Sequence, residues 1–168
     1  MTALGDLQKR AYAVSIAQRL AGSAQAILGY QEMIVEDVRE GGPADAIPDL
    51  DKVLAAAHDL NTLVDGLMSG AITAPADAES EARLRHDLRT PMNAILGYSE
   101  MVSEDFADEL TPDLAKDIDA VLNESRALLG QIDAIVDFTR ADHPETLGQD
   151  ADHTIATRLA GVIAAPAD

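Results

Sequence analysis

The sequence predicts an all-α fold in which two helical hairpins form a pseudo-symmetric antiparallel four-helix bundle. Apolar residues recur at helical spacing in four long segments, and Gly and Pro interrupt the pattern between them. The 168 residues are 47% hydrophobic but only 3% aromatic, and this supply of Ala, Leu, Ile and Val suits closely packed helices. The two halves of the chain also repeat each other.

The first hairpin is predicted at residues 1–69. Its first helix begins near Leu4 and ends before the Gly-Gly-Pro turn at residues 41–43. Its second helix begins near Pro48, since proline suits a first helical position, and continues through Leu67. The two helices and their short turn leave one apolar stripe that needs a partner.

A connector is predicted at residues 70–80, because small residues and proline break the helical pattern there. The second hairpin follows at residues 81–140, and Thr111 and Pro112 supply an N-cap and a first-turn proline for its second helix. Residues 141–168 are predicted to be a tail or linker, with one further short helix from Ile155 to Ile163.

The two hairpins are predicted to be tandem copies. Residues 26–37 and 94–105 are identical at nine of twelve positions, with an offset of 68 residues. The same offset aligns Leu60 with Leu128 and Val64 with Ile132, so the repeat includes both helices of each hairpin. Two hairpins side by side bury both apolar stripes within one chain. A homodimer, in which each hairpin pairs with its counterpart in a second copy, satisfies the same pattern.

The net charge of the chain argues against two classes of binding partner. Thirty acidic residues against 12 basic ones give a net charge of -18, which repels nucleic acid and anionic membrane surfaces. No apolar run approaches the roughly 20 residues that span a bilayer, and the N-terminus does not resemble a signal peptide. We expect a cytoplasmic protein, and the absence of cysteine excludes thiolate chemistry.

One predicted helix has a polar face next to its packed face. At 100° per residue, His86, Thr90 and Asn93 fall on one stripe. The packed side holds Leu88, Met92 and Ile95. Pro91 has no N–H for the carbonyl of Asp87, so the helix is expected to bend or loosen just after the histidine.

His86 and Asp87 together suit phosphoryl chemistry. A neutral imidazole nitrogen is a good nucleophile near neutral pH, and an adjacent carboxylate can orient the ring and take its proton. An isolated histidine in a helix is more often a solvated surface residue, so the argument depends on the neighbouring residues.

The run His86-Asp-Leu-Arg-Thr-Pro-Met-Asn93, with Ile-Leu-Gly-Tyr just beyond it, resembles the H-box of sensor histidine kinases. The resemblance implies a dimerisation and histidine phosphotransfer hairpin, with His86 as the phosphoacceptor and Asp87 as the general base. It further implies that Thr90 helps to place water for dephosphorylation of a receiver domain and that Pro91 is the proline kink. Asn93 completes the candidate site. The resemblance includes residues 80–140 and, more weakly, residues 10–69.

The first hairpin departs from this pattern. The offset places Gln18 opposite His86, and Ala21, Gly22 and Ser23 opposite the Arg-Thr-Pro positions. A glutamine amide does not hold a phosphoryl group stably. We therefore interpret the first hairpin as a degenerate copy whose work is structural.

No ATP-binding domain follows Arg140 in this sequence, since no phosphate-binding glycine loop is present there. The chain is therefore predicted to be a fragment of a histidine kinase or a separate phosphotransfer protein, with no cofactor of its own. ATP and magnesium would be bound by a partner or by a missing domain. The expected partners are a response-regulator receiver domain and a kinase ATP-binding domain, in cis or in trans.

An alternative is a bundle that dimerises or relays a conformational signal to a separate output domain without phosphorylation. The other histidines do not change these hypotheses. His58 lies near Asp59 and is interpreted as a surface residue of its helix. His143 and His153 lie among acidic residues of the tail, but their spacing fits no known metal site.

Overall fold

The computed structural model describes the backbone of residues 3–73, 75 and 77–142, and their side chains except at residues 3, 6 and 135–142. The helices are α1 (Ala3–Gly41), the short 3-10 helix η1 (Ala44–Ala46), α2 (Ile47–Ser69), α3 (Ala78–Asp105) and α4 (Pro112–Asp142). The chain divides into two compact units, Met1–Asp133 and Ala134–Asp168. The bundle described here belongs to the first unit.

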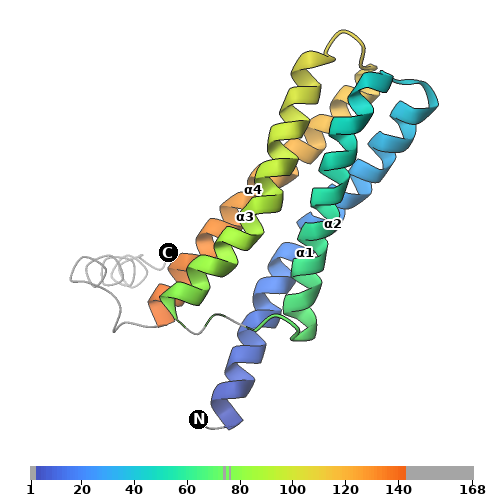
Figure 1. Cartoon of the computed structure of the whole chain (residues 1–168). Helices are drawn as coiled ribbons and strands as arrows, with labels where there is room; N and C mark the ends of the chain where they lie inside the picture. The colour runs from blue at the N-terminus through green and yellow to red at the C-terminus, as the bar shows by residue number, and fades with distance from the viewer. Residues whose placement is uncertain (1–2, 74, 76, 143–168) are drawn as a thin grey trace, which may run out of the picture. The chain divides into compact units, whose positions relative to one another are not determined.

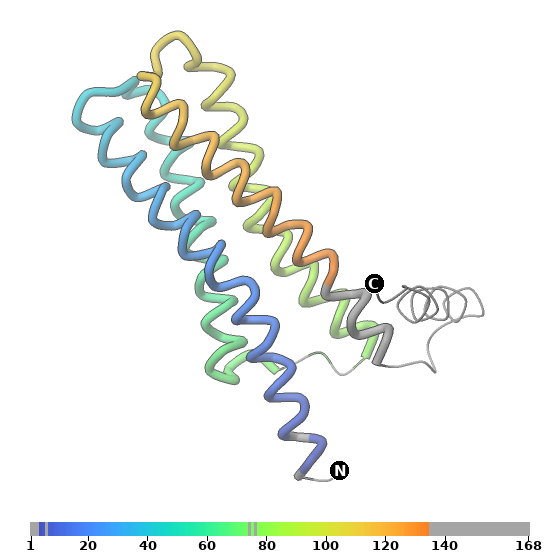
Figure 2. The backbone as a smooth tube through the Cα atoms, turned by 180° about the vertical axis from the view of Figure 1, so that it is seen from behind, coloured from blue at the N-terminus to red at the C-terminus, as the bar shows by residue number. Residues whose placement is uncertain are grey.

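The four long helices alternate in direction along the chain. Both hairpin turns lie at one end of the bundle, and the connector between α2 and α3 lies at the other (Figure 1). Helix α2 contacts both α1 and α3. Seen from behind, α1 and α4 also lie side by side (Figure 2). The two hairpins therefore pack against each other within one chain, as one of the two predicted arrangements requires.

The core confirms the prediction of an all-α bundle. Matched residues of the two hairpins are both buried, as with Leu60 and Leu128, and the core consists mainly of aliphatic side chains. The largest fully buried side chains are Leu20, Ile27, Ile34, Leu50, Leu60, Leu67, Leu88, Met92, Ile95, Ile118, Leu128 and Ile132. Burial of this apolar surface is the main favourable term in the stability of the bundle.

Polar side chains also join neighbouring helices. Buried Gln31 of α1 donates a hydrogen bond of 3.0 Å to the carbonyl oxygen of Leu50 in α2. Asn61 of α2 donates in the other direction, to the carbonyl oxygen of Ala24, also at 3.0 Å. Between the two hairpins, the Lys52 ammonium of α2 lies 4.8 Å from the ring centre of Tyr98 in α3. These contacts fix the register of α2 against both of its neighbours.

Some apolar residues of the predicted stripes are exposed. Leu4 and Leu7 are 64% and 62% exposed, because the first turns of α1 extend beyond the end of α2 (Figure 1). Met101 of α3 is 46% exposed at the edge of its stripe. Helical periodicity identifies a face, but it does not show where the neighbouring helix ends.

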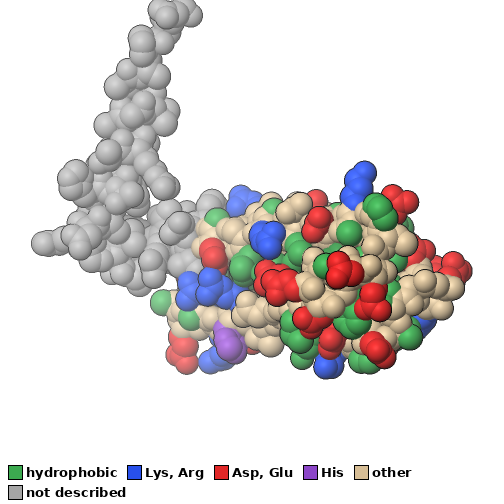
Figure 3. Space-filling model, turned by 90° about the horizontal axis from the view of Figure 1, so that it is seen from above, with side chains coloured by type: hydrophobic (Ala, Val, Ile, Leu, Met, Phe, Trp, Pro, Cys, Tyr) green, Lys and Arg blue, Asp and Glu red, His purple; other side chains and the backbone are tan. Residues whose placement is uncertain are grey.

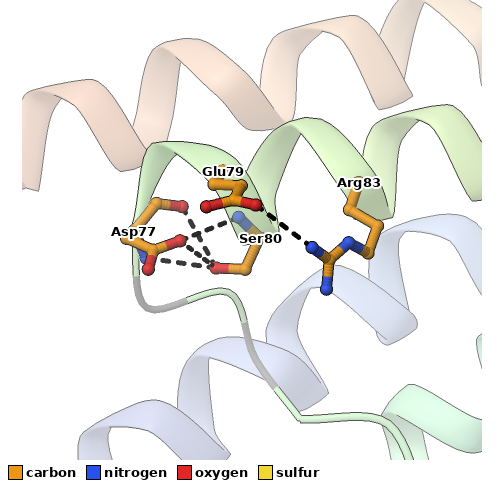
Figure 4. Close-up of polar contacts among 4 residues, drawn as sticks. All are labelled: Asp77, Glu79, Ser80 and Arg83. Atoms are coloured by element: carbon orange, nitrogen blue, oxygen red, sulfur yellow. Dashed lines mark hydrogen bonds and ion pairs between the residues drawn. The ribbon is translucent and has the colours of Figure 1, made fainter.

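Helix α3 begins earlier than predicted. Its first residue is Ala78, inside the expected connector of residues 70–80. Asp77 is the N-cap, and its carboxylate accepts a hydrogen bond of 2.8 Å from the backbone N–H of Ser80 (Figure 4). The Ser80 hydroxyl in turn accepts one from the backbone N–H of Asp77 at 3.2 Å. This reciprocal capping box stabilises the start of α3. The small residues around it had instead predicted a connector.

The Asp77 cap predicts a pH-dependent stability. The hydrogen bond from the Ser80 N–H holds the pKa of the Asp77 carboxyl below its ordinary value. A lowered folded pKa means that the contribution is present above about pH 4 and is lost as the pH falls through the folded pKa. We therefore expect Asp77→Ala to lower the free energy of unfolding at pH 7, and the difference from wild type to shrink below about pH 4. Urea melts across this range measure the difference.

The cap of α4 provides the control for this experiment. As predicted, α4 begins at Pro112, and the Thr111 hydroxyl accepts a hydrogen bond of 3.2 Å from the backbone N–H of Leu114. Thr111→Ala should lower the free energy of unfolding by about 1 kcal/mol at both pH 7 and pH 3, because a hydroxyl cap does not titrate. If the cost of Asp77→Ala stayed equally constant between pH 7 and pH 3, the carboxylate would not be the stabilising group.

The surface reflects the strongly acidic composition. Seen from above, Asp and Glu side chains outnumber the basic ones on the described part of the molecule (Figure 3). Within that described part, no helix is both long enough and apolar enough to cross a bilayer. The short helix predicted from Ile155 to Ile163 lies outside the described residues.

Candidate functional site

His86 lies on the outward face of α3. His86, Thr90 and Asn93 are all exposed, as the predicted polar stripe requires. The packed side of the helix consists of Leu88, Met92 and Ile95, each 0% exposed. The burial of this face fixes the rotation of α3, and that rotation leaves the imidazole of His86 exposed to solvent.

Thr90 and Pro91 alter the backbone next to the histidine. The Thr90 hydroxyl donates a hydrogen bond of 3.0 Å to the carbonyl oxygen of His86. Pro91 is buried within α3, which continues through it to Asp105. Because proline has no N–H, the carbonyl oxygen of Asp87 lacks its usual helical donor. A threonine bonded back to its own helix and a proline one residue later both favour a local bend.

Asp87 borders a groove between two helices. The groove has a volume of about 410 Å³ and is lined by Asp87, Thr90 and Pro91 of α3 and by Asp59, Thr62 and Leu63 of α2. The α2 residues are absent from the site that the sequence predicts. Their place in the groove follows only from knowing that α2 is the helix beside α3. The first hairpin thus supplies half of the groove beside α3.

The other side of α3 is joined to α4 by ion pairs. Arg89 pairs with Asp133, and Arg126 pairs with Glu100 at 3.3 Å. All four side chains are 44% to 56% exposed, so each pair contributes less than about 1 kcal/mol to stability. These pairs link α3 to α4, and they direct the Arg89 guanidinium toward Asp133.

The corresponding face of the first hairpin lacks these groups. Gln18 is exposed on α1, in the position that the repeat matches to His86. Ala21, Gly22 and Ser23 occupy the neighbouring matched positions, and none of these side chains repeats the Arg-Thr-Pro set. The interpretation of the first hairpin as a degenerate copy remains a prediction from the sequence.

Metal ligation finds no support among the described residues, where no three His, Asp or Glu side chains are grouped to hold an ion. His143 and His153 lie outside the residues that the structure describes. The assigned roles of His86, Asp87, Thr90 and Asn93 remain predictions, because geometry places these side chains without showing which of them reacts.

Comparison with known proteins gives a family match and several relatives. Residues 79–144 match the HisKA family, described as the His Kinase A (phospho-acceptor) domain. The chain is 31% identical over 110 residues to the sensor histidine kinase TrcS of Mycobacterium tuberculosis, a match of 62% of this chain and 21% of TrcS. It is 25% identical over 142 residues to the histidine protein kinase DivJ of Caulobacter vibrioides, a match of 82% of this chain and 24% of DivJ.

A third relative is the autoinducer 2 sensor kinase/phosphatase LuxQ of Vibrio harveyi, which is 27% identical over 101 residues, 56% of this chain and 11% of LuxQ. The chain thus spans about a quarter or less of these relatives' own length. No solved structure matches it significantly. The matched region contains the whole of α3 from its second residue, with His86 and its neighbours, and the described part of α4. Residues 79–144, which contain His86, are therefore similar to the phospho-acceptor domain of the His Kinase A family.

Proposed function

We propose that this chain is a phosphotransfer module of two-component signalling, in which His86 accepts a phosphoryl group and passes it to an aspartate of a receiver domain. The observation that supports this most directly is the exposed His86 with Asp87 beside it, inside the region that matches the phospho-acceptor family. The imidazole nitrogen attacks phosphorus, and the Asp87 carboxylate takes the proton that the ring releases. ATP and magnesium belong to a kinase ATP-binding domain, in cis or in trans.

The receiver domain would meet α3 on its exposed stripe. Thr90 lies one turn beyond His86, where its hydroxyl is able to orient a water molecule once it is released from the His86 carbonyl. Arg89 lies three residues beyond His86 and its guanidinium pairs with Asp133; released from that pair, it would stabilise the developing negative charge of the phosphoryl group. The proposed nucleophile, base and cation thus belong to residues 86–89 of α3.

Chemical loading tests the proposal without a known kinase. Phosphoramidate transfers its phosphoryl group to imidazole nitrogens, and trypsin separates His86, in peptide 86–89, from His58, in peptide 53–83. We expect phosphohistidine in peptide 86–89 that is stable in alkali and lost in acid. Addition of receiver domains with Mg²⁺ should then move the label to an aspartate. If peptide 86–89 stayed unlabelled while free N-acetylhistidine reacted, His86 would not be a phosphoryl acceptor.

A further inference from the structure

A second copy of the reactive motif occurs on α2. The run His58-Asp-Leu-Asn-Thr62 matches His86-Asp-Leu-Arg-Thr90 at four of five positions. The two runs are 28 residues apart, so this match is independent of the 68-residue repeat that relates the hairpins. The repeat instead aligns His58 with Arg126 of α4.

The two motifs have the same local structure. His58 and His86 are both exposed, while Leu60 and Leu88 are both 0% exposed. The Thr62 hydroxyl donates a hydrogen bond of 3.0 Å to the carbonyl oxygen of His58, as Thr90 does to His86. Each motif thus presents an imidazole to solvent, with a carboxylate at the next position and a threonine one turn later.

The two motifs also share one groove. Helices α2 and α3 are antiparallel neighbours (Figure 1). The α2 residues that line the groove, Asp59, Thr62 and Leu63, hold the same motif positions as the three α3 residues opposite them. The two motifs are therefore related by a local pseudo-two-fold axis across the groove.

The opposite side of the bundle lacks both motifs. There the repeat places Gln18, Arg19 and Gly22 on α1 and Arg126, Ala127 and Gly130 on α4 at the matched positions. A solvent-exposed helix surface requires polar side chains, but it does not require the His-Asp-x-x-Thr set. The surface of α1 and α4 has other side chains at these positions. Both copies of the His-Asp-Leu-x-Thr motif therefore lie on the α2 and α3 side of the bundle.

We propose that His58 is a second phosphoryl acceptor, which serves the same groove as His86. The proposal rests on the phosphotransfer function proposed above. An imidazole nitrogen of His58 attacks phosphorus, a P–N bond forms, and the bond to the leaving group breaks. With ATP as the donor the leaving group is ADP, and with phosphoramidate it is ammonia. The proton of the ring passes to the Asp59 carboxylate and then to solvent.

Two differences between the motifs predict that they load phosphoryl groups at different rates. Leu63 stands where the α3 motif has Pro91, so the carbonyl oxygen of Asp59 keeps its helical donor and α2 has no proline to bend it. Asn61 stands in place of Arg89, and its amide donates to the carbonyl oxygens of Ala24 and Ala57. His58 therefore has no corresponding cation, and we expect it to load more slowly than His86 but faster than free histidine.

Phosphoramidate loading of the full chain, followed by tryptic mapping, measures both sites in one digest. We expect peptide 53–83, which holds His58 as its single histidine, to be labelled at least tenfold faster than N-acetylhistidine amide. Asp59→Asn should lower the ratio of label in peptide 53–83 to label in peptide 86–89 at least tenfold. Asp87→Asn should raise the same ratio. Both changes replace exposed side chains with isosteric ones, and circular dichroism checks that the bundle is intact.

The outcomes separate this proposal from the previous one. Label in peptide 86–89 without label above the reference rate in peptide 53–83 refutes His58 as an acceptor and leaves the function of His86 standing. Label in peptide 53–83 alone supports His58 and refutes His86. If peptide 53–83 is labelled but Asp59→Asn leaves the ratio unchanged, its histidine reacts as any exposed imidazole does, and the proposal fails.

Discussion

Replacement of His86 by glutamine is expected to abolish phosphoryl transfer through the α3 motif, a loss of at least a hundredfold, without unfolding the bundle. A glutamine amide is a poor nucleophile and cannot replace the imidazole nitrogen. The fold should tolerate it, because His86 is exposed and the matched position of α1 already holds glutamine, at Gln18. The measurement is label passed to a receiver domain, made in chains that also contain His58→Gln so that the second motif does not contribute.

The reciprocal substitution is the matched control. Gln18→His places an exposed imidazole on the matched position of the first hairpin, but the next residue there is Arg19 instead of an aspartate. We expect this new histidine to react no faster than free N-acetylhistidine. Transfer that persists when both His58 and His86 are replaced by glutamine would show that neither motif is the route of the phosphoryl group.

Leu60→Ala is expected to destabilise the whole bundle by about 2 to 5 kcal/mol. Leu60 is 0% exposed in α2, the helix that contacts both α1 and α3. The change leaves a cavity that close-packed neighbours fill only in part, and the loss is a large fraction of a typical stability of about 5 to 15 kcal/mol. Urea unfolding followed by circular dichroism gives the magnitude, and hydrogen exchange gives its distribution along the chain.

The hydrogen-exchange pattern tests whether the first hairpin supports the second. If the hairpins form one cooperative unit, peptides of α3 should lose protection together with those of α1 and α2. Met101→Ala on α3 is the control, since Met101 is 46% exposed and should cost less than about 1 kcal/mol. Loss of protection confined to α1 and α2 would instead indicate two independent hairpins and contradict a structural role for the first one.

Periodicity was sufficient to predict the four helices, because each buries one continuous apolar stripe. The packed residues around His86 were predicted correctly for the same reason. Leu88, Met92 and Ile95 recur at three- and four-residue spacing, and this spacing places His86 on the exposed face. The start of α3 was predicted too late, because its capping box depends on two polar side chains, Asp77 and Ser80, which apolar periodicity does not detect.

The groove next to the histidine could not be predicted in the same way. Its α2 half depends on which helix lies beside α3 and on the register between them, and neither follows from the pattern of a single helix. Asp59 and Thr62 are ordinary polar residues until Asp87 and Thr90 are found across from them. The His-Asp-Leu-x-Thr match between α2 and α3 is present in the sequence, but its offset of 28 residues differs from the 68-residue offset of the tandem repeat, so the repeat does not reveal it.

The connector that joins the two hairpins has a consequence for how this bundle holds together and how it can vary. Separate chains lose partners on dilution, whereas two hairpins on one polypeptide meet at an effective concentration set by the linker alone. A substitution in a symmetric pair of chains changes both flanks of the bundle at once. Here each hairpin is encoded separately, so substitutions can add reactive groups to one hairpin and remove them from the other.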